Sequence, residues 1–218
     1  MATPSSGAIS LNDMHVEVGG SSGSTVSIND SDIRALTGKS SGATASWNDY
    51  YGKAKDWSFS MTVGATNVYS SGNDYVAASN VRYKGYNDGS ASFRPSGTSY
   101  GSMTDYADSD FLGGQTIDTF NVSGNSEVTT AQATTMLFAT DSSSATVANN
   151  DTAFKKVTIN SNVYNRSDAT YSAAAGDRSQ WQWSITQTVA NDNTSAMTPF
   201  TAVGNSCSIV FSRNPWAK

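Results

Sequence analysis

The residues able to carry acid–base or nucleophilic chemistry are few in this chain of 218 residues. His15 is the single histidine and Cys207 the single cysteine. A Ser–His–Asp or Cys–His arrangement would have to use His15, which lies in a short repeated segment and not beside a predicted cleft. Cys207 alternates with Ile209 and Phe211, as a small apolar residue buried on a strand does. We therefore expect no catalytic residue, and a protein that is not an enzyme.

A small acidic cluster is the next candidate for chemistry. Asp105, Asp108 and Asp110 fall within one short stretch. Two carboxylates across a cleft can cleave a glycosidic bond, and several oxygen ligands can hold Ca²⁺. The glycine and closing glutamate of a helix–loop–helix calcium loop are absent here, and acids so close in sequence usually decorate a turn. We expect a solvated turn and no cofactor, with Ca²⁺ left open as the alternative.

Aromatic residues suggest two places for recognition. Trp181 and Trp183 fall on one face of a predicted strand, where a core position is more common than a sugar-stacking site. A Tyr-rich stretch precedes them, and Tyr offers a large contact area at little entropic cost. The candidate receptor contacts in this stretch are Tyr69, Tyr75, Tyr83 and Tyr86.

The composition limits the partners that these residues can have. Only 14% of the residues are charged, the net charge is −5, and no run of Lys or Arg occurs. A nucleic-acid partner is therefore disfavoured, because phosphate contacts need a basic patch. No apolar stretch is long enough for membrane insertion. Aromatic residues make up 11% of the chain and supply material for a core, while Ser, Thr, Asn, Asp and Gly give it a polar surface.

An internal repeat organises the N-terminal part of the chain. The order apolar–Ser–apolar–Asn–Asp occurs at residues 9–13, 26–30 and, more weakly, 45–49. Asn and Asp accept the free N–H groups of a first helical turn, and a Gly after each unit suits a helix end. Each unit is predicted to be a short extended piece, a cap and one or two helical turns. Residues 14–18 fit an alternating strand equally well.

Repeat units this small do not bury a core alone. Their apolar residues need a cover, which is the main domain, another copy, or a larger assembly; a packed N-terminal subdomain is the alternative to docking. We predict that residues 1–53 form a docking segment. Its candidate contacts are Leu11, Asn12, Asp13, Ile28, Asn29, Asp30, Trp47, Asn48 and Asp49.

Period-two alternation replaces the repeat from Trp57 onward. Short alternating runs with no long helical pattern among them are typical of an antiparallel β-sandwich or jelly-roll-like domain, which we assign to residues 54–218. Asp88-Gly89 predicts a tight hairpin turn, and residues 64–110 are expected to be an inserted surface of loops and edge strands. The remaining predicted strands and hairpin lie at residues 57–63, 116–122, 135–139, 154–164, 181–185 and 207–211. The protein is thus expected to be mainly β.

The N-terminal repeat resembles a known group of proteins. Gly7-Ala-Ile-Ser-Leu-Asn-Asp13 and Trp47-Asn-Asp-Tyr-Tyr-Gly-Lys53 look like the start of tail proteins of marine and cyanobacterial tailed phages. In those proteins an Ile-Ser-Leu-Asn-Asp segment recurs and ends in a Tyr-Gly-Lys or similar triplet. A similarity in short segments continues into the β domain, for example at Gln180-Trp-Gln-Trp183.

The resemblance implies a virion structural protein, with a tail fibre or baseplate position preferred to the head. It also implies docking on other virion proteins, trimers around a symmetric tail, and no shared catalytic motif. Two alternatives stay open: a module that binds a receptor or a host cell-surface glycan, and a capsid decoration protein.

Overall fold

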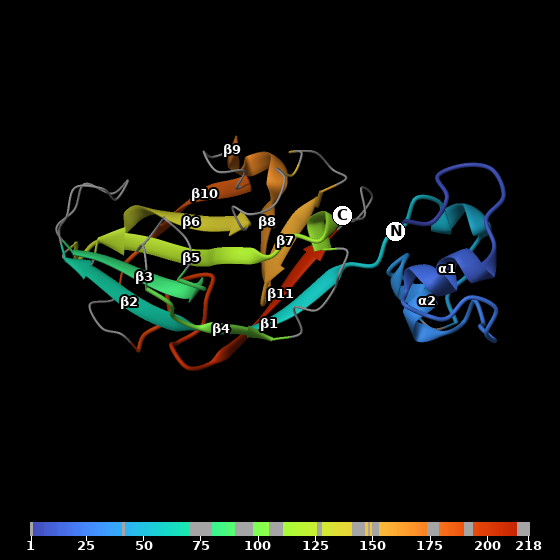
Figure 1. Ribbon diagram of the computed structural model, residues 1–218, viewed down its shortest axis with the longest axis horizontal. Coiled ribbons are helices and arrows are strands. Elements are labelled where there is room, and N and C mark those ends of the chain that lie inside the picture. Colours follow the sequence, from blue (N-terminus) through green and yellow to red (C-terminus); the bar gives the residue numbers. More distant parts are fainter. Residues whose placement is uncertain are drawn as a thin grey trace. The chain divides into compact units, whose positions relative to one another are not determined.

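The computed structural model describes residues 2–40, 42–69, 80–89, 98–104, 111–125, 128–140, 147, 149, 153–173, 179–189 and 194–212 (Figure 1). The chain divides into two compact units: Met1–Trp57 together with Ser212–Lys218, and Ser58–Phe211. The first unit continues beyond Lys53, the expected end of the docking segment, because Ala54 is buried and the amide of Lys55 donates to Glu17 Oε1 at 2.9 Å.

Each repeat leads into one short helix of the first unit. These helices are α1 (Leu11–Glu17), α2 (Ser31–Ala35) and the 3-10 helix η1 (Trp47–Tyr50). Residues 14–17, for which helix and strand fitted equally well, belong to α1. The helix prevails because Ser10 and Asp13 cap its first turn reciprocally, which the alternation pattern alone does not reveal.

The first unit has a hydrophobic core of its own. Met14, Ile33 and Tyr50 are fully buried, and Leu36 is nearly so. The apolar residues of all three repeats pack around these four side chains: Ile9, Leu11, Val18, Val26, Ile28 and Ala45. Leu11 and Ile28 are partly buried against this core, as in the packed N-terminal subdomain that the sequence left open beside docking.

The two ends of the first unit are fastened together. The amide of Thr3 donates to Lys53 O at 2.8 Å, and the amide of Gly52 donates to Pro4 O at 2.9 Å. Thr3 Oγ1 adds a hydrogen bond to Tyr50 O and accepts one from the amide of Lys53. Residues 3–53 thus form a closed body stabilised by long-range backbone hydrogen bonds.

The second unit is a β-sandwich, which confirms the predicted fold class. Its two antiparallel sheets pack against each other (Figure 1). The five-stranded sheet has the order β4 (Ser102–Thr104), β1 (Trp57–Thr62), β11 (Ser206–Ser212), β7 (Lys156–Ile159), β8 (Asn162–Asn165). The six-stranded sheet has the order β2 (Gly64–Tyr69), β3 (Asn80–Asn87), β5 (Ile117–Asn125), β6 (Gln132–Thr140), β10 (Ser179–Gln187), β9 (Thr170–Ala173). Two 3-10 helices accompany them, η2 (Phe111–Gly113) and η3 (Arg166–Asp168).

Aromatic side chains fill the space between the two sheets. Phe211 of β11 lies 4.9 Å from Phe138 of β6, between ring centroids, and 5.2 Å from Phe154. Phe138 also stacks on Trp181 at 5.3 Å. Trp183 is buried as well, so the preference for core positions over sugar stacking is confirmed for both tryptophans. Clusters of rings in such edge-to-face and stacked geometries are a large source of sandwich stability.

Of two expectations for residues 64–110, one was wrong and the other is confirmed in part. Asp88-Gly89 does not form a tight hairpin turn, because Asn87 pairs with Tyr100 through two backbone hydrogen bonds of 2.9 and 3.0 Å. In this stretch, the expectation of edge strands is confirmed for β2 and β4, each of which lies at the edge of its sheet, whereas β3 is an inner strand between β2 and β5. Glycines allow its backbones to cross closely: a Cβ at Gly101, where φ is +69°, would meet Gly85 O at 2.3 Å.

Candidate docking surface

The Ser and Asp of each repeat form the same local structure. The carboxylate of the Asp accepts the backbone N–H of the Ser three residues earlier. The N···O distances are 2.7 Å for Ser10–Asp13, 2.8 Å for Ser27–Asp30 and 2.7 Å for Ser46–Asp49. Sequence reasoning assigned the cap to Asn or Asp, but Ser is the N-cap of α1 and η1; Asp30 alone is an N-cap, at α2. The Ser-x-x-Asp spacing was the signal that identifies the capping box.

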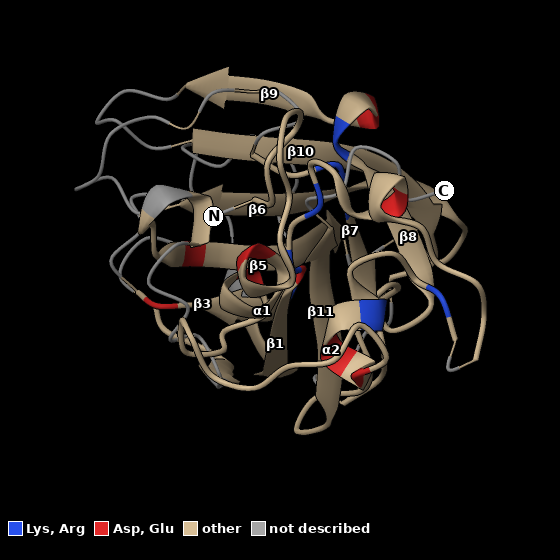
Figure 2. Ribbon diagram, turned by 90° about the vertical axis from the view of Figure 1, so that its right-hand side faces the viewer, with Lys and Arg blue, Asp and Glu red and all other residues tan. Residues whose placement is uncertain are grey.

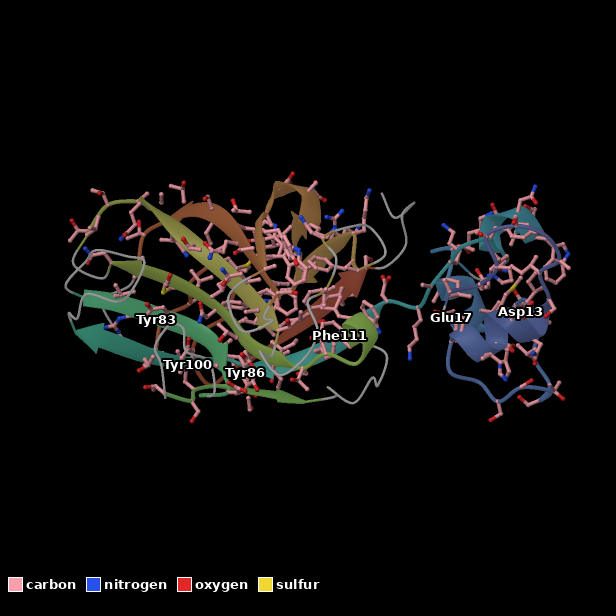
Figure 3. All side chains as sticks on the ribbon, turned by 45° about the horizontal axis from the view of Figure 1, so that its top comes forward. Asp13, Glu17, Tyr83, Tyr86, Tyr100 and Phe111 are labelled. Atoms are coloured by element: carbon pink, nitrogen blue, oxygen red, sulfur yellow. The ribbon has the colours of Figure 1, made fainter. Side chains whose placement is uncertain are left out.

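These contacts give the Asp residues a structural role. The side-chain hydrogen bond from Ser10 lowers the pKa of Asp13, and the hydrogen bond from Lys39 lowers the pKa of Asp49. Both carboxylates are therefore ionised near neutral pH and hydrogen-bonded within their own unit; Figure 3 shows Asp13 within the first unit. As candidate docking contacts, Asp13, Asp30 and Asp49 are better explained as fasteners of the repeat.

The helices also form hydrogen bonds with the segments that connect one repeat to the next, which we call the spacers. Asn12 Oδ1 accepts the amide of Gly23 at 2.9 Å, so this docking candidate also has an intramolecular contact. Arg34, which is buried, donates to Ser40 O and to Ala43 O. Each spacer is thus held by the helix that precedes it.

His15 contacts the segment that follows α1. Its Nε2 lies 2.7 Å from Ser24 Oγ, and that hydroxyl also lies 2.7 Å from Ser21 O. The tautomer of the imidazole decides which of His15 and Ser24 is the donor.

The third repeat departs from the other two and leaves an aromatic side chain exposed. Trp47 occupies the repeat position of Leu11 and Ile28, which pack on the core of the unit, yet 48% of its surface is exposed. Tyr50 fills the core near the third repeat instead. Asn48, the residue after Trp47, is exposed too. Asn12, Asn29 and Asp30 of the predicted docking set are exposed as well.

Asp49, two residues after Trp47, forms a charged pair with Lys39. Lys39 Nζ lies 2.6 Å from Asp49 Oδ2 and also donates to Thr44 O at 3.0 Å. A half-exposed pair of this kind adds little to stability, but it holds η1 against the preceding spacer. We call Trp47, Asn48 and the Lys39–Asp49 pair the Trp47 surface.

The structure gives less support to the tyrosines predicted as receptor contacts. Tyr83 is fully buried and packs with Val81 and Tyr100, so its assignment as a receptor contact was wrong (Figure 3). Its position on β3 turns it toward Tyr100, which the Tyr-rich composition alone does not reveal. Tyr86 is half-buried, and burial raises its pKa. Tyr75 and the side chain of Tyr69 lie outside the described residues.

Other candidate chemistry has little support in the described parts of the chain. Cys207 is buried as predicted, and burial raises the pKa of its thiol to about 11, which makes it a poor nucleophile. The acidic cluster of Asp105, Asp108 and Asp110 falls outside the described residues. Among the residues that are described, no three His, Cys, Asp or Glu side chains are grouped to hold a metal ion.

No described helix is both long and apolar enough to cross a membrane. Comparisons of the chain with protein-family models, with curated proteins and with solved structures give no match. The resemblance to phage tail proteins therefore stays a prediction, and the argument for function rests on the residues above.

Proposed function

We propose that this protein is a structural component of a tailed-phage particle, in the tail fibre or baseplate, that docks through its N-terminal unit. In this role the protein performs no catalysis. Its partners are other virion proteins, and its own copies assemble as a trimer on the symmetric tail. The resemblance of the repeat to tail proteins supports the setting.

One observation carries the docking role: the closed first unit exposes Trp47 at the position where its other repeats pack a partly buried apolar residue against the core. The unit has its own core, which does not include Trp47, so the unit does not need to bury this ring in order to fold. Trp is among the residues most often responsible for binding energy at protein interfaces, where it fills a pocket of the partner. We expect a partner with an apolar pocket, rimmed by groups that hydrogen-bond the amide of Asn48.

The test is incorporation of a Trp47→Ala protein into particles that lack the native copy. Truncating a central interface Trp costs about 2 kcal/mol or more, which is about a 30-fold loss of affinity. Val163→Ala is the matched control, because Val163 is an exposed apolar residue (52%) of the second unit. Circular dichroism of both variants shows whether each is folded.

The expected result is that Trp47→Ala is depleted from purified particles while Val163→Ala is retained. Normal incorporation of the Trp47 variant would refute docking through this surface. Antibody-gold labelling of the particles then separates the positions: label at the tail supports the proposal, and label over the head makes the chain a capsid decoration protein.

A further inference from the structure

The short helix η1 determines how the ring of Trp47 leaves the first unit. In the first two repeats the residue at this position, Leu11 or Ile28, packs against the core of the unit. Trp47 instead exposes 48% of its surface from η1, which is a single 3-10 turn of four residues. A helix this short is not stable by itself. The direction of the exposed ring therefore depends on the contacts that hold η1 in place.

Side chains hold η1 at both of its ends. At the C-terminal end, Tyr50 is fully buried in the core of the unit. Around the N-terminal end, Asp49 Oδ2 accepts the amide of Ser46 at 2.7 Å and the ammonium group of Lys39 at 2.6 Å. The same ammonium group donates to Thr44 O at 3.0 Å. Lys39 thus joins the spacer that contains it to the start of η1 (Figure 2 colours Lys and Arg blue).

The ammonium group is an addition that belongs to the third repeat. In the first repeat the carboxylate of Asp13 accepts the amide and the hydroxyl of Ser10, each at 2.7 Å. In the second, the carboxylate of Asp30 accepts the amide of Ser27 at 2.8 Å. Both of those repeats also pack their apolar residue on the core. The ionic contact therefore occurs in the repeat whose exposed apolar residue, Trp47, contributes least to holding its own helix.

We propose that Lys39 is a positioning residue for docking: through Asp49 it holds η1 so that the ring of Trp47 is presented in one orientation before the partner arrives. This inference rests on the proposed docking role and adds to it a residue that acts through another. A surface ordered in advance binds more tightly, because less conformational entropy is lost on association. A half-exposed ion pair is a weak contact, so its removal should weaken docking about two- to fivefold.

The first part of the test measures the mobility of the ring and needs no particle. The readout is ¹⁵N relaxation of the Trp47 indole N–H in the full-length protein, with that resonance assigned by Trp47→Phe. Lys39→Met should lower the order parameter of this N–H, and Lys39→Arg, which keeps the charge, should restore it. Lys55→Met is the matched control, because Lys55 is an exposed lysine of the same unit whose bond to Glu17 uses its backbone amide.

The second part is a competition for particles that lack the native copy. Native protein and a variant are mixed in equal amounts, and their ratio in purified particles is measured. Lys39→Met should be under-represented about two- to fivefold, while Lys39→Arg and Lys55→Met should match the native protein. Circular dichroism should show that all three variants are folded, so that a loss in the competition reports docking.

Three results would overturn the inference. Unchanged mobility of the Trp47 ring in Lys39→Met would show that the lysine does not position it, and a docking loss without a mobility change would make Lys39 a direct contact of the partner. Equal incorporation of Lys39→Met, in an assay that depletes Trp47→Ala, would refute the positioning role alone. Normal incorporation of Trp47→Ala is the separate outcome that refutes the docking role itself.

Discussion

Replacing Met14 with Ala should unfold the first unit and leave the sandwich intact. Met14 lies in α1, is fully buried, and packs against Ile33, Leu36 and Tyr50. Truncating a buried Met to Ala costs about 2–5 kcal/mol. A single small core rarely supplies more than about 3–5 kcal/mol of stability, so the loss is comparable with the whole. Ala is itself a good helix former, which means that the effect arises from packing.

Hydrogen exchange measured by mass spectrometry reports the two units separately. In Met14→Ala, peptides from α1 and α2 should lose protection while peptides from β5 and β6 keep theirs. The matched control is Met136→Ala, because Met136 is an equally buried Met in β6 of the sandwich. It should show the opposite pattern. Unchanged protection of α1, or equal loss of protection in both units, would contradict the division into independently packed cores.

Three further predictions concern single contacts. Hydrogen bonds, first that from Lys39, hold the pKa of Asp49 below its ordinary value of 3.8. These bonds therefore stabilise the first unit above about pH 4, and their contribution is lost as the pH falls. Asp49→Asn should make the thermal unfolding temperature of the first unit less dependent on pH in this range. Gly101→Ala places a Cβ 2.3 Å from a carbonyl of β3, whereas Gly204→Ala, at φ +85°, meets nothing within 4 Å. The second change should cost about 1 kcal/mol and the first at least twice that in chemical denaturation, and equal costs would refute the close-packing argument. Gly20→Ala brings a Cβ to 2.2 Å from the imidazole of His15 and should displace that ring, seen as shifted imidazole resonances; an unmoved ring would refute it.

Much of the sandwich was predictable because strand burial leaves a local signature. Trp181 and Trp183 alternate with polar residues, and both are buried in β10. Cys207 follows the same rule in β11. Alternation does not tell which face of a strand meets the other sheet and which meets a covering segment. Tyr83 was taken for a surface residue because its stretch is rich in Tyr, although Tyr100 packs on it.

The docking candidates were harder to predict because the residues that recur in each repeat include those that stabilise the repeat itself by hydrogen bonds. Asp13 and Asp49 recur at one spacing because each bonds to the Ser three residues before it. Recurrence within one sequence therefore marked the internal scaffold of the unit. Trp47 is informative for the opposite reason, since it breaks the pattern of the other two repeats.

The hydrogen bonds between Thr3 and Lys53 bring the two ends of residues 3–53 together, which affects how this segment can be joined to other proteins. Because Thr3 is hydrogen-bonded to Lys53, residues 3–53 span only a short distance between their ends. A segment with adjacent ends can be spliced into a surface loop of an unrelated protein without stretching either partner.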